Sequence, residues 1–117
     1  MMRPLRFACT RLYTLNGGIQ SNLVVDIHPE GHYVERIYSI GMEEHPFTEW
    51  LGGTIILSNQ PYEVLSYYTS ILGLKLTIHD WIDRFLLDKE NTMSNQPVYA
   101  CHINSTSIEE VMPARLL

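Results

Sequence analysis

The chain has 117 residues, of which 45% are hydrophobic and 18% charged, with a formal net charge of −5 at pH 7. This size and composition are typical of one globular domain spanning residues 1–117, and they exclude a disordered, fibrous or multidomain chain. No apolar run approaches the ~20 residues that a membrane helix needs, and the N-terminus lacks the apolar stretch of a signal peptide, so we expect a cytoplasmic protein without a membrane partner.

The first half of the chain alternates apolar and polar residues, with glycine-containing turns between the alternating segments. Asn16-Gly17-Gly18 and Pro29-Glu30-Gly31 favour turns because Asn and Gly tolerate a positive φ at little cost. The period of two is that of half-buried strands. We therefore predict an antiparallel β-meander within residues 1–58, its basic first strand beside more acidic second and third strands. These three strands cover residues 5–15, 20–28 and 33–40.

The period changes after a short apolar run at residues 54–57, which suits a covered strand. Gly52-Gly53 just before it indicates a bulge or a close backbone approach. Residues 59–88 form a helical segment. Apolar spacing predicts a helix over 61–72, although its aromatic and β-branched content leaves a strand open. The spacing after Thr77 predicts a second helix, with Thr77 and Asp80 as a capping pair.

The last part of the chain, residues 98–117, returns to strand character. Residues 98–104 are predicted as a strand, whereas 108–117 fit either a capped helical turn or a final edge strand. The predicted fold class is α+β and mainly β: an antiparallel meander closed by C-terminal strands, with one or two helices packed on it.

Chemistry-bearing residues do not assemble into a recognisable catalytic motif. The five histidines form neither HxH nor HExxH, so we predict no metal site and no cofactor. Cys9 and Cys101 fall in strand patterns, where a buried thiol is inert. Cations are too few and scattered for a phosphate-tracking surface, so nucleic acid is not an expected partner. The histidines are His28, His32, His45, His79 and His102.

Residues 49–53, Glu-Trp-Leu-Gly-Gly, form the one unusual cluster. Trp50 could fill a packing corner above the two glycines. Alternatively, Trp50, Glu49 and His45 could line a pocket for a small molecule. Both interpretations stay open from the sequence.

The order of elements in residues 5–57 resembles the opening β-domain of amidohydrolase-superfamily enzymes. The matching segments are 6–13, 23–27 and 34–37, separated by glycine turns. In that superfamily the next strand carries histidines that bind metal, but the corresponding residues 52–60 contain none, so the resemblance implies a detached β-domain without the metal site. Residues 48–53, Thr-Glu-Trp-Leu-Gly-Gly, also resemble a motif of short uncharacterised bacterial proteins.

A β-domain detached from its barrel should keep apolar surface that another molecule covers. We therefore expect a non-catalytic interaction or structural module that associates with itself as a homodimer or with a protein partner. The tyrosine-rich surface, including Tyr38, Tyr62, Tyr67 and Tyr68, suits such a role. The alternative is the small-molecule-binding module with its pocket near Trp50.

Overall fold

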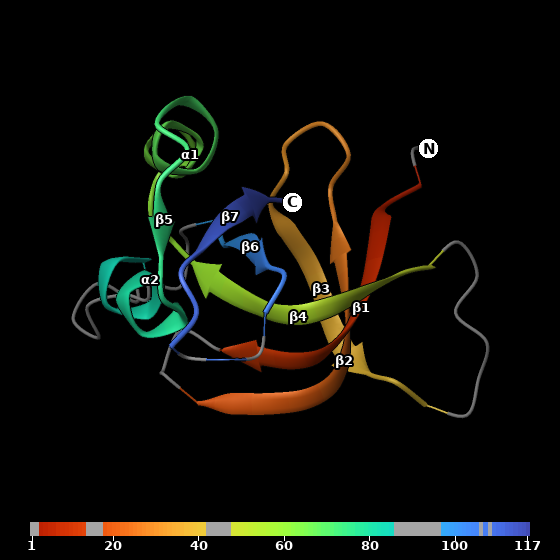
Figure 1. The fold of residues 1–117 in the computed structure, drawn as a ribbon. Helices are drawn as coiled ribbons and strands as arrows, with labels where there is room; N and C mark the ends of the chain where they lie inside the picture. Colours follow the sequence, from red (N-terminus) through yellow and green to blue (C-terminus); the bar gives the residue numbers. More distant parts are fainter. Residues whose placement is uncertain (1–2, 14–17, 42–47, 86–96, 106, 108) are drawn as a thin grey trace.

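A computed structural model describes residues 3–13, 18–41, 48–85, 97–105, 107 and 109–117. Within them, one seven-stranded sheet has the order β3-β2-β1-β4-β6-β7-β5, and helices lie beside it (Figure 1). The strands are β1 (Leu5–Tyr13), β2 (Ile19–Ile27), β3 (Val34–Ser39), β4 (Thr48–Ser58), β5 (Lys75–Leu76), β6 (Tyr99–Ile103) and β7 (Met112–Leu116). The helices are α1 (Tyr62–Ser66), its π-helical continuation η1 (Tyr67–Ile71) and α2 (Ile78–Phe85).

The sheet is mixed, so the prediction of an antiparallel meander is only partly right. β1, β2 and β3 do pair antiparallel in sequence order. β4, however, pairs parallel with β1, because the chain first passes through β2 and β3 on one side of β1 and then returns along its other side. The period of two in each strand specifies which face is buried, but it does not specify the partner or its direction.

The predicted closure by C-terminal strands is also only partial. The sheet has two separate ends, β3 and β5. One isolated antiparallel bridge between Tyr33 and Tyr99 joins the start of β3 to the start of β6, and the Val34 N–H donates to the Val98 carbonyl at 2.7 Å. The first strands therefore curl towards β6 without forming a closed ladder.

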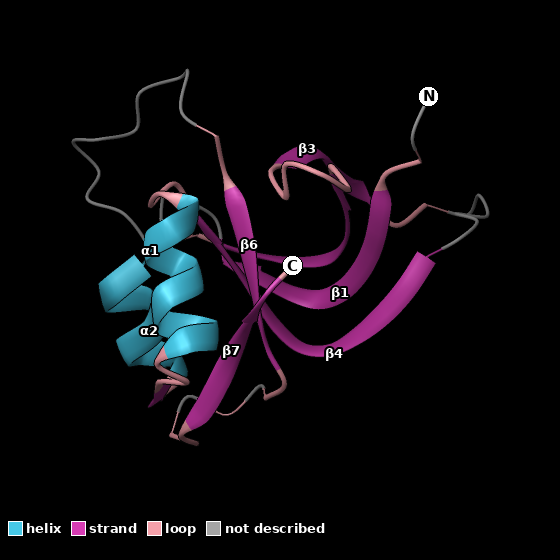
Figure 2. Ribbon diagram, turned by 90° about the horizontal axis from the view of Figure 1, so that it is seen from above, coloured by secondary structure: helices cyan, strands magenta, loops and turns pink. Residues whose placement is uncertain are grey.

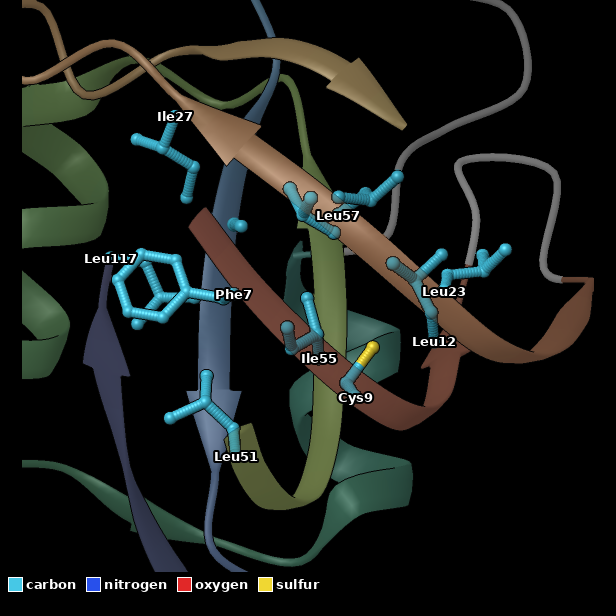
Figure 3. Close-up of a cluster of buried hydrophobic side chains, with 11 residues drawn as sticks. Phe7, Cys9, Leu12, Leu23, Ile27, Leu51, Ile55, Leu57 and Leu117 are labelled. Atoms are coloured by element: carbon cyan, nitrogen blue, oxygen red, sulfur yellow. The ribbon is translucent and has the colours of Figure 1, made fainter. Parts of the chain in front are cut away.

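One face of the curled sheet encloses a first apolar cluster (Figure 3). Leu23, Val25 and Ile27 of β2 all lie in it, as their spacing predicts, and Leu117 reaches it from the end of the chain. Burial of these side chains is what holds β1, β2 and β4 in a curved arrangement. The buried members are Phe7, Cys9, Leu12, Leu23, Val25, Ile27, Leu51, Ile55, Leu57, Ala100 and Leu117.

The opposite face carries a second cluster, which the helices cover (Figure 2). Ile78 and Trp81 of α2 are buried in it, and the Trp81 Nε1–H donates to the Met112 carbonyl at 3.0 Å. The Asp80 N–H donates to Thr77 Oγ1 at 3.1 Å, so the predicted cap is present. The buried members are Tyr13, Ile56, Leu65, Ile78, Trp81, Cys101, Ile103 and Ala114.

The two ambiguous segments have definite structures. Residues 62–71 are helical rather than extended. The C-terminal segment is a strand, β7, which pairs antiparallel with β6 and with the two-residue β5, so β5 and not β7 forms that edge of the sheet. Among the described residues, no helix has the length and apolar character needed to cross a membrane. The predicted turn at residues 16–18 falls mostly outside the described residues.

Candidate functional site

Strand β4 has different surroundings at its two ends. Residues 54–56 lie between β1 and β6, whereas residues 48–51 have β1 as their only strand partner among the described residues. The change occurs at Gly53, which has a φ of +80°. A Cβ there would clash with the Ile103 carbonyl and lie 2.6 Å from the Ser105 nitrogen. The predicted bulge is thus present, and it requires glycine.

Strand β6 ends at Ile103 for two physical reasons. The Leu117 N–H donates to the Ala100 carbonyl at 2.9 Å, and in an antiparallel ladder every second residue donates to the same neighbour. The N–H of residue 113 should therefore donate to the carbonyl of Asn104, one residue beyond Ile103. Residue 113 is Pro113, which has no N–H. In addition, the Ser105 N–H donates back to the Ile103 carbonyl at 2.8 Å, and this tight turn takes the chain out of the ladder.

Beyond the end of β6, β4 and β7 flank a cavity of about 610 Å³. We call it the β4–β7 gap. Its lining includes Leu51, which belongs to the first apolar cluster, and Ala114, which belongs to the second. Because both faces of the sheet contribute, the cavity is a gap between strand edges and not a hollow on one face. Its lining residues are Trp50, Leu51, Gly52, His102, Asn104, Met112, Pro113, Ala114 and Arg115.

The polar groups of the gap lie where β6 stops. His102 Nε2 lies 2.6 Å from the Gly52 carbonyl oxygen, and since a carbonyl only accepts, Nε2 carries the hydrogen. Asn104 and Arg115 are exposed, and neither side chain has a hydrogen bond or ion pair to another described residue. The gap therefore offers a guanidinium and an amide that are available to an incoming molecule.

The sequence-predicted site residues do not all meet at this gap. Trp50 lines it and is 66% exposed, so the packing-corner interpretation is wrong. Glu49 is exposed but is not among the lining residues. Successive strand residues point to opposite faces, so Glu49 and Trp50 cannot converge on one ligand from the same side. His45 lies outside the described residues.

Sequence reasoning missed His102, Asn104 and Arg115, which come from β6 and β7. A usable signal was present at Pro113, because a proline inside a strand pattern marks a place where a ladder ends or stays unpaired. Its meaning depends on which strand lies alongside, and that information is not local in the sequence.

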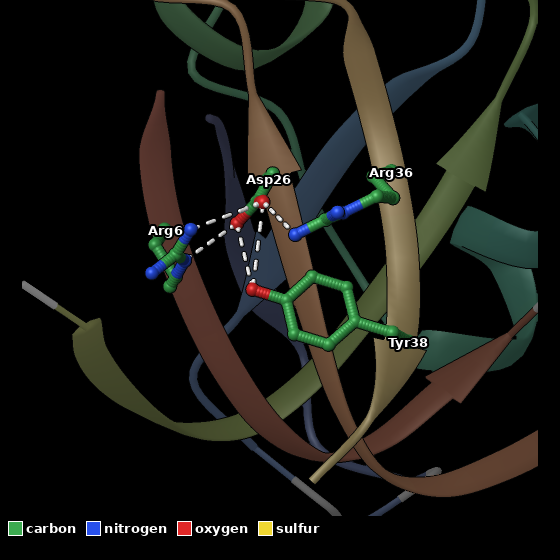
Figure 4. A network of polar contacts seen from close by, with 4 residues as sticks. All are labelled: Arg6, Asp26, Arg36 and Tyr38. Carbon is green, nitrogen blue, oxygen red and sulfur yellow. Dashed lines mark hydrogen bonds and ion pairs between the residues drawn. The ribbon is translucent and has the colours of Figure 1, made fainter. Parts of the chain in front are cut away.

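The most buried acid of the described residues, Asp26, belongs to a structural network and not to this gap (Figure 4). Its carboxylate accepts from Arg6 Nε at 2.9 Å and from the Tyr38 hydroxyl at 3.2 Å, and it lies 3.5 Å from Arg36 Nη2. The hydrogen bond with Asp26 raises the pKa of Arg6. The predicted contact between the basic first strand and its acidic neighbour is confirmed here. With its oxygens occupied, Asp26 links β1, β2 and β3 and is not a free base.

Neither thiol is positioned for nucleophilic chemistry. Cys9 lies in the first cluster and Cys101 in the second, on opposite faces of the sheet. Burial raises the pKa of Cys9 to about 11 and that of Cys101 to about 12. Both are therefore protonated at neutral pH, and a protonated thiol is a poor nucleophile.

The described histidines serve separate local contacts. His28 Nδ1 accepts from the Gly31 N–H at 2.9 Å in the turn between β2 and β3, whereas His79 lies 3.3 Å from Asp83 on α2. His32 Nδ1 lies 3.2 Å from the Leu117 carbonyl oxygen. No group of three or more metal-ligating side chains occurs within the described part of the chain.

Comparison with known protein families, curated proteins and solved structures finds no match. The resemblance to an amidohydrolase β-domain therefore stays a prediction. The β4–β7 gap is the feature of the molecule from which a function can be inferred.

Proposed function

We propose that this protein is a non-catalytic interaction module that binds an extended polypeptide segment in the β4–β7 gap. The observation that supports this role is the gap itself: an opening between two strand edges with an exposed tryptophan in its wall. Large exposed aromatic side chains are typical of binding surfaces, since they provide much contact area at a low cost in conformational entropy.

The backbone at the gap suits the addition of a strand. The Gly52 carbonyl faces this side of β4, as its contact with His102 shows. Because the N–H and C=O of successive strand residues point to alternate sides, the backbone N–H and C=O of Trp50 face the gap as well. An extended segment can hydrogen-bond to them in the place of a continued β6, which is the recognition mode known as β-augmentation.

The presence of a strand on each side of the gap restricts what can occupy it. β4 forms one side and β7 the other. An edge strand of a second folded copy already has a neighbour on one side, so only one of its edges is free. A terminal or loop segment has two free edges. We therefore favour a segment of another protein in the gap over the homodimer that the sequence also suggested.

A small-molecule ligand is the alternative, because a volume of about 610 Å³ lies within the range of ligand pockets, roughly 300–1,000 Å³. A thermal-shift screen against metabolites tests this alternative. A small molecule at about 100 times its dissociation constant should stabilise the fold by about 2.7 kcal/mol. A bound strand should slow the hydrogen exchange of the Trp50 amide, whereas a bound small molecule should leave that exchange rate unchanged.

The direct test of strand addition is a selection of phage-displayed random octapeptides on the purified chain. Trp50→Thr and Gly52→Phe should abolish binding of the selected peptides. A Cβ on Gly52 meets only Asn104 Oδ1, at 3.7 Å, so the phenylalanine can occupy the gap without backbone strain. Ile71→Ser is the matched control, because Ile71 is 74% exposed on η1 and does not line the gap.

A bound peptide should also slow the hydrogen exchange of the Trp50 amide. The proposal is overturned if no peptide is enriched, or if the enriched peptides bind Gly52→Phe as tightly as the wild type. It is equally overturned if they bind while the exchange rate at residue 50 stays unchanged.

A further inference from the structure

We infer that the segment bound in the β4–β7 gap is acidic, with a carboxylate placed against Arg115. This inference rests on the proposed function and specifies the chemistry of the partner. Among the described residues that line the gap, Arg115 and His102 have ionisable side chains, and none is Asp or Glu. The chain as a whole carries a net charge of −5, so this lining differs in sign from the average surface.

Arg115 is free to recognise a ligand. It is exposed on β7, and no carboxylate of the described residues pairs with it. Other arginines of the chain are engaged: Arg6 pairs with Asp26, and the Arg84 guanidinium lies 5.7 Å from the centre of the Tyr68 ring. A planar guanidinium with five N–H donors matches a carboxylate, which it can bind with two parallel hydrogen bonds.

The register of β7 places this arginine at the inner end of the gap. Arg115 lies opposite His102, so both side chains flank the last residues of β6. A strand that continues the track of β6 begins beyond Asn104, in a gap that Arg115 also lines. A side chain near its start can therefore contact the Arg115 guanidinium, while its later residues pass Trp50. The gap thus favours an acidic residue at one end of the bound segment and an apolar contact with the indole further along.

His102 lies opposite Arg115 in the ladder and donates its Nε2–H to the Gly52 carbonyl. The exposed Asn104 amide provides a further donor beside them. A lysine-rich or arginine-rich segment would meet only like charge at this end.

The test is the same octapeptide selection carried out in parallel on the wild type, on Arg115→Gln and on Arg84→Gln. Arg84→Gln removes the same charge from exposed α2 and is the matched control. Peptides enriched on the wild type and on Arg84→Gln should contain an excess of Asp and Glu over the starting library, and that excess should disappear on Arg115→Gln. Replacing the acidic residue of the best peptide by its amide should weaken binding to the wild type about tenfold and leave binding to Arg115→Gln unchanged.

The outcomes separate this inference from the proposed function. If the enriched peptides depend on Trp50 but show no acidic excess, or keep that excess on Arg115→Gln, the acidic partner is wrong and the strand-binding gap stands. If no gap-dependent peptide is enriched on any of the three proteins, the proposed function itself fails. Weaker binding of the acidic peptide at high salt, by contrast with its amide version, would support the charge contact.

Discussion

The two ends of β4 differ: one end is built into the sheet, and the other is the end that we propose for recognition. Residues 54–56 have β1 on one side and β6 on the other, and Ile55 and Ile56 are almost completely buried. Residues 48–51 have β1 alone among the described strands, and Trp50 is mostly exposed. Trp50 is thus exposed where β6 no longer lies alongside β4, whereas its neighbour Leu51 is still buried in the first apolar cluster.

The largest difference between the two ends should appear in stability. Ile55→Ala should lower the free energy of unfolding by about 3 to 4 kcal/mol, because it leaves a cavity in the first apolar cluster. Urea denaturation followed by the fluorescence of the buried Trp81 measures this loss. Ile71→Ala, on the exposed surface of η1, should change it by less than about 0.5 kcal/mol. A loss below about 1 kcal/mol for Ile55→Ala would contradict the buried position.

The boundary between the ends can be tested at the paired glycines. Gly53→Ala should cost about 2 to 3 kcal/mol, because alanine is strained at a φ of +80° and its Cβ meets the backbone of Ile103 and Ser105. Gly52→Ala, whose Cβ has only the ordinary contact with Asn104, is the control and should be nearly neutral. Equal costs for the two substitutions, measured by urea denaturation, would place the bulge elsewhere.

The two thiols give a chemical measure of the same contrast. Cys9 of β1 pairs with Leu51 at the exposed end of β4, whereas Cys101 of β6 pairs with Ile56 at the buried end. Burial raises their pKa values to about 11 and about 12, so at pH 8 to 9 the thiolate fraction of Cys9 should be the larger. Alkylation by iodoacetamide, followed by mass spectrometry, should therefore modify Cys9 faster than Cys101. Faster modification of Cys101 would contradict the contrast.

The same pKa shifts predict a loss of stability in alkali. Unfolded thiols lose their proton near pH 9, whereas the folded thiols keep it until about pH 11 to 12. Between these values the unfolded state binds fewer protons, so the thiols contribute a decrease in stability as the pH rises. Cys101→Ala should lessen the decrease between pH 8 and 10, and an unaltered slope in urea denaturation series would argue against burial as the cause.

The smallest effect is expected at the exposed end. Trp50→Thr keeps a residue that favours strands and should change the free energy of unfolding by less than about 0.5 kcal/mol, while peptide binding is lost. A fluorescence-monitored urea titration measures the first quantity and the peptide selection the second. A loss of stability above about 1 kcal/mol would mean that the indole supports the fold. The main observation behind the proposed recognition role, an exposed Trp50 that is available to a partner, would then fail.

The sequence could predict the elements whose pattern is local. The helical spacing around Trp81 and the alternation in β2 predict elements that are both present near their predicted positions, although residues 23–27 of β2 are buried on both faces. The gap could not be predicted in this way. It depends on Pro113 facing the end of β6 and on Gly53 facing Ile103, which are contacts between residues far apart in the chain. The sequence points to Trp50, but it groups Trp50 with its neighbours in the chain and not with His102 and Arg115 across the gap.

The parallel pairing of β1 with β4 also has a consequence for how the chain is made. During synthesis β2 emerges soon after β1 and can pair with it at once, but the other edge of β1 must wait until residues 48–58 have left the ribosome. β4 in turn waits for residues 99–103. The nascent chain therefore carries an uncovered apolar edge for most of its synthesis, which is the stage at which such chains are most prone to aggregate.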